Sequence, residues 1–151
     1  MTKRVTQYAM TQKGFSLIEI MVVLVIMGLL ASIVAPNVME ALGDSKKKKV
    51  QADFANIETA LKMYKLDNFI FPTSEQGLEA LVVPPESDPQ PKNWRQSGYL
   101  PELPIDPWGE EYLYVSPGES GKPYDIYTLG ADGIRGGVDE AVDITNWDRP
   151  E

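Results

Sequence analysis

The stretch that decides the fold is KGFSLIEIMVVLVIMGLL, residues 13–30. From Ile20 to Leu30 it is apolar all round, and Glu19 is the one charged residue across residues 15–39. A helix over residues 15–39 would be about 38 Å long, which is enough to cross a hydrocarbon core of about 30 Å. The sequence therefore predicts one membrane-spanning helix near the N-terminus.

The charges on either side of this stretch indicate its orientation. Residues 1–14 contain three basic side chains and no acidic one, whereas the chain from Asp67 onward has 17 acids against five bases. The positive-inside rule therefore places residues 1–14 in the cytoplasm and the acidic body across the membrane. Three interpretations are open: a plain anchor, a secretory signal cleaved near residues 30–35, or a segment trimmed at its N-terminal edge and retained.

The N-terminal edge of the stretch favours the third interpretation. Residues 13–19 read KGFSLIE, which resembles the prepilin signature of type IV pilins and pseudopilins: a basic residue, Gly, Phe, a hydroxyl residue, two aliphatic residues and Glu. The resemblance implies that a membrane aspartyl peptidase cuts between Gly14 and Phe15 and methylates the new amino group of Phe15. Residues 1–14 are then a leader peptide, and residues 15–39 remain as the transmembrane and polymerisation helix.

Glu19 needs a separate explanation, because a carboxylate inside an apolar helix costs about 2.5–3.5 kcal/mol on insertion. One explanation is that Glu19 lies near enough to the interface to stay hydrated. The other pairs it with the α-amino group that cleavage creates on Phe15. In the pilin family the matching Glu pairs with the amine of a neighbouring subunit, which fixes the axial stagger between copies. A buried pair of this kind specifies register more than it adds stability.

Two features follow the membrane segment. Pro36 removes one backbone donor and clashes with the preceding turn, so a kink or local melting is expected there. Residues 46–49 are four consecutive lysines. They form either a solvated helix face near anionic lipid headgroups or a contact with the acidic body of a neighbouring subunit.

An amphipathic stripe then extends the helix to about Leu66. Its apolar residues recur at intervals of four, three, four and three, and they are Val50, Phe54, Ile57, Leu61 and Tyr64. This spacing places them on one helical face. The face packs either on a partner helix of a coiled coil or, as we expect, on a sheet formed by the rest of the chain.

The remainder reads as a small head. Residues 74–81 predict a short helix with Ser74 as N-cap, and residues 112–115 and 124–129 predict a β-hairpin. The predicted fold class is α+β and pilin-like, with a long N-terminal helix, membrane-embedded in its first half, packed on a small antiparallel sheet. The head then spans residues 40–151 and includes the amphipathic helix half, residues 46–66.

Three further segments narrow the resemblance within the pilin superfamily. They read MYKLDN at residues 63–68, PTSEQGL at 72–78 and DPWG at 106–109. Together with the signature at Phe15 they resemble the major pseudopilins of the type II secretion system. The Cys pair that closes the C-terminal loop of many type IV pilins is absent, because the chain has no Cys.

The C-terminal loop, residues 129–144, contains four acids and four glycines. Clustered carboxylates on a flexible loop suit Ca²⁺, although the EF-hand spacing is absent, and from residue types alone a solvated acidic loop is the alternative. The resemblance implies a calcium site. Its expected ligands are the carboxylates of Asp132, Asp139 and Asp143 and the main-chain carbonyls of Leu129 and Ile134. Trp147 is expected to pack the tail onto the sheet.

Composition excludes several classes of protein. Without Cys or His the chain forms neither thiolate metal sites nor a Ser-His-Asp triad. A net charge of −8 argues against nucleic-acid binding. A membrane-tethered enzyme would need a cluster of acid and base groups, and the one acidic cluster is the loop assigned to calcium. We therefore expect no catalytic activity.

The resemblance implies a structural function. The chain is expected to polymerise with copies of itself into a helical periplasmic pseudopilus that drives export of folded proteins across the outer membrane. Expected partners are the prepilin peptidase/methyltransferase, minor pseudopilins, the inner-membrane assembly platform and membrane lipid. The expected location is the bacterial inner membrane, with a single span and a periplasmic head. The alternative function is that of a major type IV pilin in adhesion, motility or DNA uptake.

Overall fold

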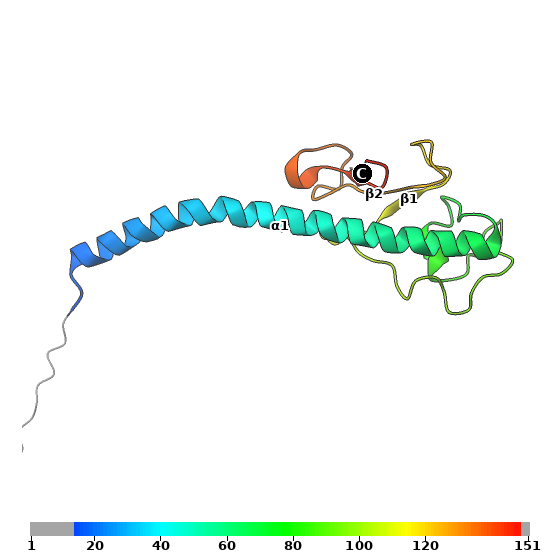
Figure 1. The fold of residues 1–151 in the computed structure, drawn as a ribbon, viewed down its shortest axis with the longest axis horizontal. Coiled ribbons are helices and arrows are strands. Elements are labelled where there is room, and N and C mark those ends of the chain that lie inside the picture. The colour runs from blue at the N-terminus through cyan, green and yellow to red at the C-terminus, as the bar shows by residue number, and fades with distance from the viewer. Residues whose placement is uncertain (1–13, 149–151) are drawn as a thin grey trace, which may run out of the picture. The chain divides into compact units, whose positions relative to one another are not determined.

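One long helix dominates the computed structural model, which describes residues 14–148; the basic part of the predicted leader, residues 1–13, lies outside the described residues. Helix α1 spans Leu17–Asn68, 52 residues (Figure 1). It passes through Pro36 without a break, so the local melting expected there is not observed. A proline removes only one backbone hydrogen bond from a long helix. Just beyond it, the side-chain Nδ2 of Asn37 donates to the carbonyl of Ile33 at 3.1 Å.

The chain divides into two compact units, residues 1–40 and 41–151. In the first unit every described residue is exposed, including the whole apolar run from residue 17 to 39. The second unit contains all of the buried core. We call the second unit the head.

The amphipathic stripe forms the centre of the head, as the spacing predicts. Its five residues are fully buried. They pack in one cluster with residues from the rest of the head, among them Leu81, Tyr112, Tyr114, Tyr124 and Ile126. The face of α1 selected by the sequence pattern is therefore buried by the chain's own head, and no second helix is needed to cover it.

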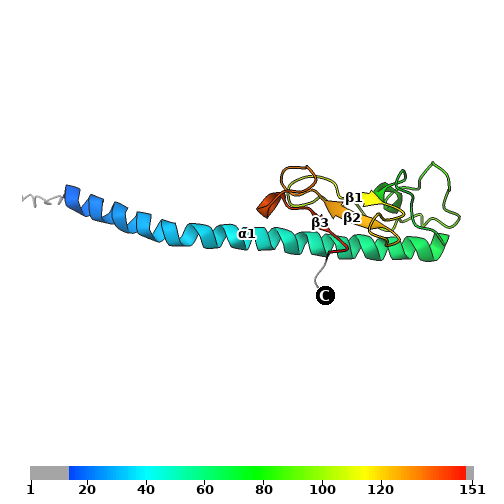
Figure 2. The same ribbon diagram turned by 90° about the horizontal axis from the view of Figure 1, so that it is seen from above.

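A three-stranded antiparallel sheet lies alongside the second half of α1 (Figure 2). Its strands, in spatial order, are β1 (Leu113–Val115), β2 (Asp125–Thr128) and β3 (Ile144–Thr145). Leu113 pairs with Tyr127, and Thr128 pairs with Ile144. The predicted hairpin is confirmed. The third strand was not predicted, because two residues carry no recognisable period.

The predicted helix over residues 74–81 is wrong in its first half. A turn over residues 74–77 precedes a 3₁₀ helix, η1, at Leu78–Leu81. Gly77 has a φ of 61°, which breaks helical geometry between the two. Ser74 is not an N-cap: its hydroxyl accepts the amide hydrogen of Ser116 at 2.8 Å and so ties this turn to the end of β1.

Candidate functional site

The predicted cleavage bond, Gly14–Phe15, lies outside regular structure. Residues 14–16 are not helical, and α1 begins at Leu17. The side chain of Phe15 is 84% exposed. A β-carbon built on Gly14 would meet no atom within 4 Å. The bond is therefore accessible, and no packing within the described chain constrains the residue that precedes it.

Glu19 lies in the first turn of α1 and has a local hydrogen-bond partner. Its Oε2 accepts the backbone N–H of Ser16 at 3.1 Å. Ser16 immediately precedes the helix, so a carboxylate three residues later satisfies one of the unpaired N–H groups at the helix start, as in a capping box. The carboxylate is thereby directed toward the N-terminal end of the helix, where cleavage would create the Phe15 amine.

Helix α1 is long and apolar enough at its N-terminal end to cross a membrane, and it is the one such helix among residues 14–148. No residue of its apolar window is buried within the chain. A stretch of this size would not stay exposed to water. It requires lipid or other copies of the chain to cover it.

The four lysines after the span divide into two pairs. Lys46 donates to Glu140 at 2.7 Å, and Lys49 donates to Asp53 at 2.7 Å and to the carbonyl of Ile105. The Lys46 ammonium holds the pKa of the Glu140 carboxyl below its ordinary value, chiefly through this hydrogen bond. Lys47 and Lys48 are exposed. Lys46 and Lys49 thus join α1 to the loops of the head, and Lys47 and Lys48 face solvent.

Two of the predicted calcium ligands already accept backbone hydrogen bonds. Asp132 Oδ1 accepts the N–H of Ile134 at 3.0 Å, and Asp143 Oδ2 accepts the N–H of Gly136 at 3.0 Å. The other oxygen of Asp143, Oδ1, is buried without a partner. Asp139 is exposed at the start of the 3₁₀ helix η2, Asp139–Ala141.

The three predicted aspartate ligands are not grouped in this structure. Leu129 follows β2 directly, and Ile134 is exposed. Across residues 14–148 no three acidic side chains are grouped as around a metal ion, so the three aspartates are not brought together. The donor chemistry nevertheless fits calcium, because every proposed ligand is a hard oxygen and Asp143 offers one that lacks a donor.

A buried chain of hydrogen bonds, which could not be predicted from the sequence, holds the start of the C-terminal loop. Asp106 accepts the backbone N–H groups of Trp108 and Glu110, both at 2.9 Å, through Oδ1. Its Oδ2 accepts the hydroxyl of Thr128, whose oxygen in turn accepts the N–H of Gly130 at 3.3 Å. The DPWG turn and the first residues of the loop are therefore joined through one buried carboxylate.

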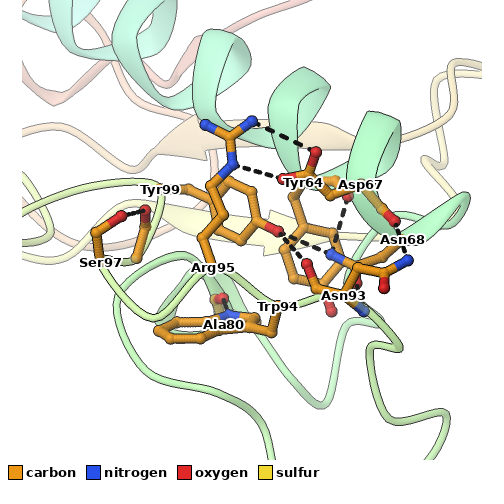
Figure 3. Close-up of polar contacts among 10 residues, drawn as sticks. Tyr64, Asp67, Asn68, Ala80, Asn93, Trp94, Arg95, Ser97 and Tyr99 are labelled. Carbon is orange, nitrogen blue, oxygen red and sulfur yellow. Dashed lines mark hydrogen bonds and ion pairs between the residues drawn. The ribbon is translucent and has the colours of Figure 1, made fainter.

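A second polar network fastens residues 93–99 to the end of α1 (Figure 3). Arg95 Nε donates to Asp67 Oδ2 at 2.6 Å, and its Nη2 donates to Oδ1 at 3.4 Å. Asn68 donates to the Tyr99 hydroxyl at 2.9 Å and accepts the N–H of Asn93 at 2.9 Å. Arg95, chiefly through its hydrogen bond, lowers the pKa of Asp67 below its ordinary value.

The tail is held on the sheet as expected. The ring of Trp147 lies edge-on to that of Tyr127, with centroids 6.2 Å apart. Tyr127 belongs to β2, so this contact brings the end of the described chain onto the middle strand.

Comparison with known proteins identifies two matching sequence families. Residues 37–147 match the family described as type II secretion system (T2SS), protein G. Residues 9–35 match the prokaryotic N-terminal methylation motif. The first match covers most of the chain, and the second covers the predicted cleavage bond and much of the apolar run.

Individual relatives agree with these matches. The type II secretion system core protein G of Pseudomonas aeruginosa is 56% identical over 137 residues, which is 91% of this chain and 96% of the relative. That of Vibrio cholerae is 51% identical over 90% of this chain and 92% of the relative. The crystal structure of the major pseudopilin from the type 2 secretion system of enterohaemorrhagic Escherichia coli is also similar. It has a TM-score of 0.67 and 44% identity, and the match covers 74% of this chain and 95% of that one.

Proposed function

This chain belongs to the type II secretion system protein G family, and we propose on that premise that it is the major structural subunit of a periplasmic pseudopilus. The proposal rests on one observation: the apolar N-terminal part of α1 has no buried residue, and it precedes a head whose core is complete in itself. Such a helix suits a subunit that is stored in the membrane and then packs against copies of itself. The type IV pilin alternative is not favoured by these relatives.

We further propose that maturation occurs at Gly14/Phe15. The methylation motif spans this bond, which lies in non-helical backbone next to an exposed Phe15. The prepilin peptidase/methyltransferase would remove residues 1–14 and methylate the Phe15 amine. The mature chain would then keep its membrane helix and start with the group that Glu19 needs as a partner.

N-terminal sequencing and intact mass measurement of the membrane-purified protein test this maturation. The expected product begins with methylated Phe15. A matched variant, Gly14→Val, should remain uncut while its head melts normally, because a side chain at this position meets no other atom. Gly28→Ala, which also meets no atom within 4 Å, is the control and should be processed. A product beginning after Ala35, or normal processing of Gly14→Val, would contradict the proposal.

In the assembled fibre we propose that Glu19 pairs with the Phe15 amine of a neighbouring copy. The carboxylate already points toward the N-terminal end of its helix through the hydrogen bond from Ser16. A positively charged amine arriving from a second helix would add an ion pair to the hydrogen bond that the carboxylate already accepts from Ser16. The pair would then set the axial offset between subunits.

We also propose that the C-terminal loop binds calcium through Asp132, Asp139, Asp143 and the carbonyls of Leu129 and Ile134. Support comes from the buried, unpartnered Oδ1 of Asp143 and from the glycine-rich chain around it. The ion would neutralise carboxylates that otherwise repel and would tie down a loop that has no disulfide. Because the aspartates are not grouped in this structure, binding would require the loop to close around the ion.

The proposed setting follows from charge and hydropathy. The span would lie in the bacterial inner membrane with residues 1–14 cytoplasmic and the head periplasmic. Minor pseudopilins and the inner-membrane assembly platform would extract the subunit from lipid. The role is structural, since the family is one of fibre subunits, and the energy for export comes from elsewhere in the machine.

A further inference from the structure

An acidic groove on the head has no counter-ion within residues 14–148. The groove has a volume of about 250 Å³ and lies between β1 and residues 74–79, which comprise the turn and the start of η1. Glu75, Glu79 and Glu111 line it, and all three are exposed. None of them takes part in any of the four ion pairs that join the described residues. Three unpaired carboxylates around one groove raise the local negative potential and favour a cationic occupant.

The apolar residues that also line the groove indicate which kind of cation it would bind. Leu103, Pro104 and Leu113 contribute apolar surface beside the carboxylates, and Leu113 is 39% exposed. Lysine has this dual character, because its four-carbon stem packs on apolar surface while the ammonium remains among charged groups. The groove therefore fits lysine side chains better than it fits a bare metal ion.

Two lysines of the same chain are presented away from its head. Lys46 and Lys49 are three residues apart on one face of α1, and both bind groups of the head. At about 100° per residue, Lys47 and Lys48 lie about 100° and 200° round the helix from Lys46. Both are exposed and form no ion pair within the described chain. They are positioned to meet another molecule.

The distribution of charge in the head favours a second copy as that molecule. Residues 41–66 hold six lysines against three acids, whereas residues 67–151 hold 17 acids against five bases. Each copy thus carries a basic helix face and an acidic body on different elements. A contact between two different surfaces is heterologous, and its repetition produces a ring or an open helical filament rather than a two-fold dimer.

We propose that Lys47 and Lys48 of one copy enter the groove lined by Glu75, Glu79 and Glu111 of the next copy. The contact would be a lateral one between heads, separate from the Glu19 pairing in the membrane helix. It rests on the proposed polymerisation and names the surfaces that the heads use in it.

Disulfide cross-linking tests the geometry cleanly, because the natural chain has no cysteine. Two paired variants are made in the full chain: Lys48→Cys with Glu79→Cys, and Lys47→Cys with Glu111→Cys. Each copy then carries one cysteine on each surface, so oxidation of assembled fibres should give a ladder of covalent multimers. The control pair is Lys122→Cys with Glu79→Cys, which places an equally exposed lysine position outside the proposed contact. It should remain monomeric.

Charge reversal tests the ion pairs themselves. Lys47→Glu with Lys48→Glu should reduce fibre yield at least tenfold, and so should Glu75→Lys with Glu79→Lys. Combining all four changes should restore the yield to within about twofold of the natural chain. Melting of each head reports whether the fold is retained, since none of these side chains is buried.

The outcomes separate this inference from the proposed function. Fibres of normal yield without a cross-linked ladder would overturn the lateral contact and leave polymerisation intact. Loss of fibres in the lysine variant with neither a ladder nor rescue would also overturn it, and would assign these lysines to lipid headgroups or another partner. If the natural chain forms no fibres at all, the proposed function itself fails.

Discussion

At the scale of single residues, Glu19 combines two roles that one substitution can separate. Its carboxylate caps the helix by accepting the N–H of Ser16, and its charge is proposed to bind a neighbour's amine. A glutamine at this position retains an acceptor for the cap, whereas a leucine retains neither role. Glu19→Gln therefore tests the charge, and comparison of Glu19→Gln with Glu19→Leu tests the cap.

We expect Glu19→Gln to be cleaved and methylated normally but to give at least tenfold fewer fibres, because the neutral amide cannot form the ion pair. Glu40→Gln, an exposed acid near the end of the span, is the matched control and should assemble. Electron microscopy and sedimentation of sheared fibres measure the yield. Normal fibres from Glu19→Gln, together with failure of Glu19→Leu, would show that the cap and not the charge is required.

Asp67 gives the head a predictable response to acid. Its pKa is lower in the folded head than its ordinary value, chiefly through the hydrogen bond from Arg95. A carboxyl whose folded pKa is depressed contributes stability that is complete above the unfolded pKa, about 3.9, and is lost as the pH falls toward the folded value.

Asp67→Asn should therefore destabilise the head at pH 7 and reduce the loss of stability between about pH 5 and pH 2. Urea unfolding across this range measures both effects. Glu102→Gln, an exposed acid without an ion pair in the described chain, should leave the pH profile unchanged. An Asp67→Asn profile parallel to that of the natural chain would show that the ion pair does not contribute.

At the scale of elements, the amphipathic stripe should carry much of the head's stability. Ile57 is fully buried in the core, so Ile57→Ala should lower the free energy of unfolding by about 2–5 kcal/mol through lost burial and a cavity. Leu66 lies on the same helix but is 75% exposed, and Leu66→Ala should change it by less than about 0.5 kcal/mol. Chemical denaturation measures both. Equal effects would mean that the buried face does not hold the head together.

The helices and strands that could be predicted are those specified by a pattern of residues close together in the sequence. The stripe has a helical period because one face of α1 is buried, and the hairpin has two β-rich runs around a Pro-Gly turn. The melting expected at Pro36 does not occur because one lost hydrogen bond does not end a helix that continues on both sides. The cap expected at Ser74 does not form because its hydroxyl instead binds Ser116, 42 residues away.

The candidate sites also differ in whether their residues are close together in the sequence. The processing motif is contiguous, so residues 13–19 reveal it without a structure. Asp67 and Arg95 are 28 residues apart, and Asp106 and Thr128 are 22 apart. Neither pair has a sequence signal, because each exists only after the loops have packed on α1 and the sheet. Main-chain ligands such as Leu129 also have no sequence signal, since every residue has a carbonyl.

The C-terminal loop provides the last prediction at this scale. If calcium binds there, EGTA should lower the Tm of the purified protein by several degrees, and excess calcium should restore it while magnesium should not. At a calcium concentration 100 times the Kd the ion would contribute about 2.7 kcal/mol. Asp143→Asn should melt near the EGTA-treated temperature and no longer respond to chelation. Identical melting curves with and without EGTA would remove the metal from the proposal.

At the scale of the whole molecule, stability and assembly are assigned to different parts of the chain. Every buried core residue belongs to the unit that begins at residue 41, whereas the exposed apolar run belongs to the unit that ends at residue 40. The head folds around its own core. In the proposed function, lipid covers the apolar run before assembly, and the apolar runs of neighbouring copies cover it in the fibre.

A chain that begins at Ala41 should therefore keep the head's Tm but form no fibres at any concentration tested, because it retains the entire core and has lost the span and Glu19. Thermal unfolding of the truncated and full chains measures the first expectation, and electron microscopy measures the second. A matched chain with Val22, Val25 and Leu29 changed to Ser should also retain its Tm and lose assembly, since these side chains are exposed in the isolated molecule. Fibres formed by the truncated chain would mean that contacts between heads alone are sufficient. A large drop in its Tm would mean instead that the apolar run stabilises the head.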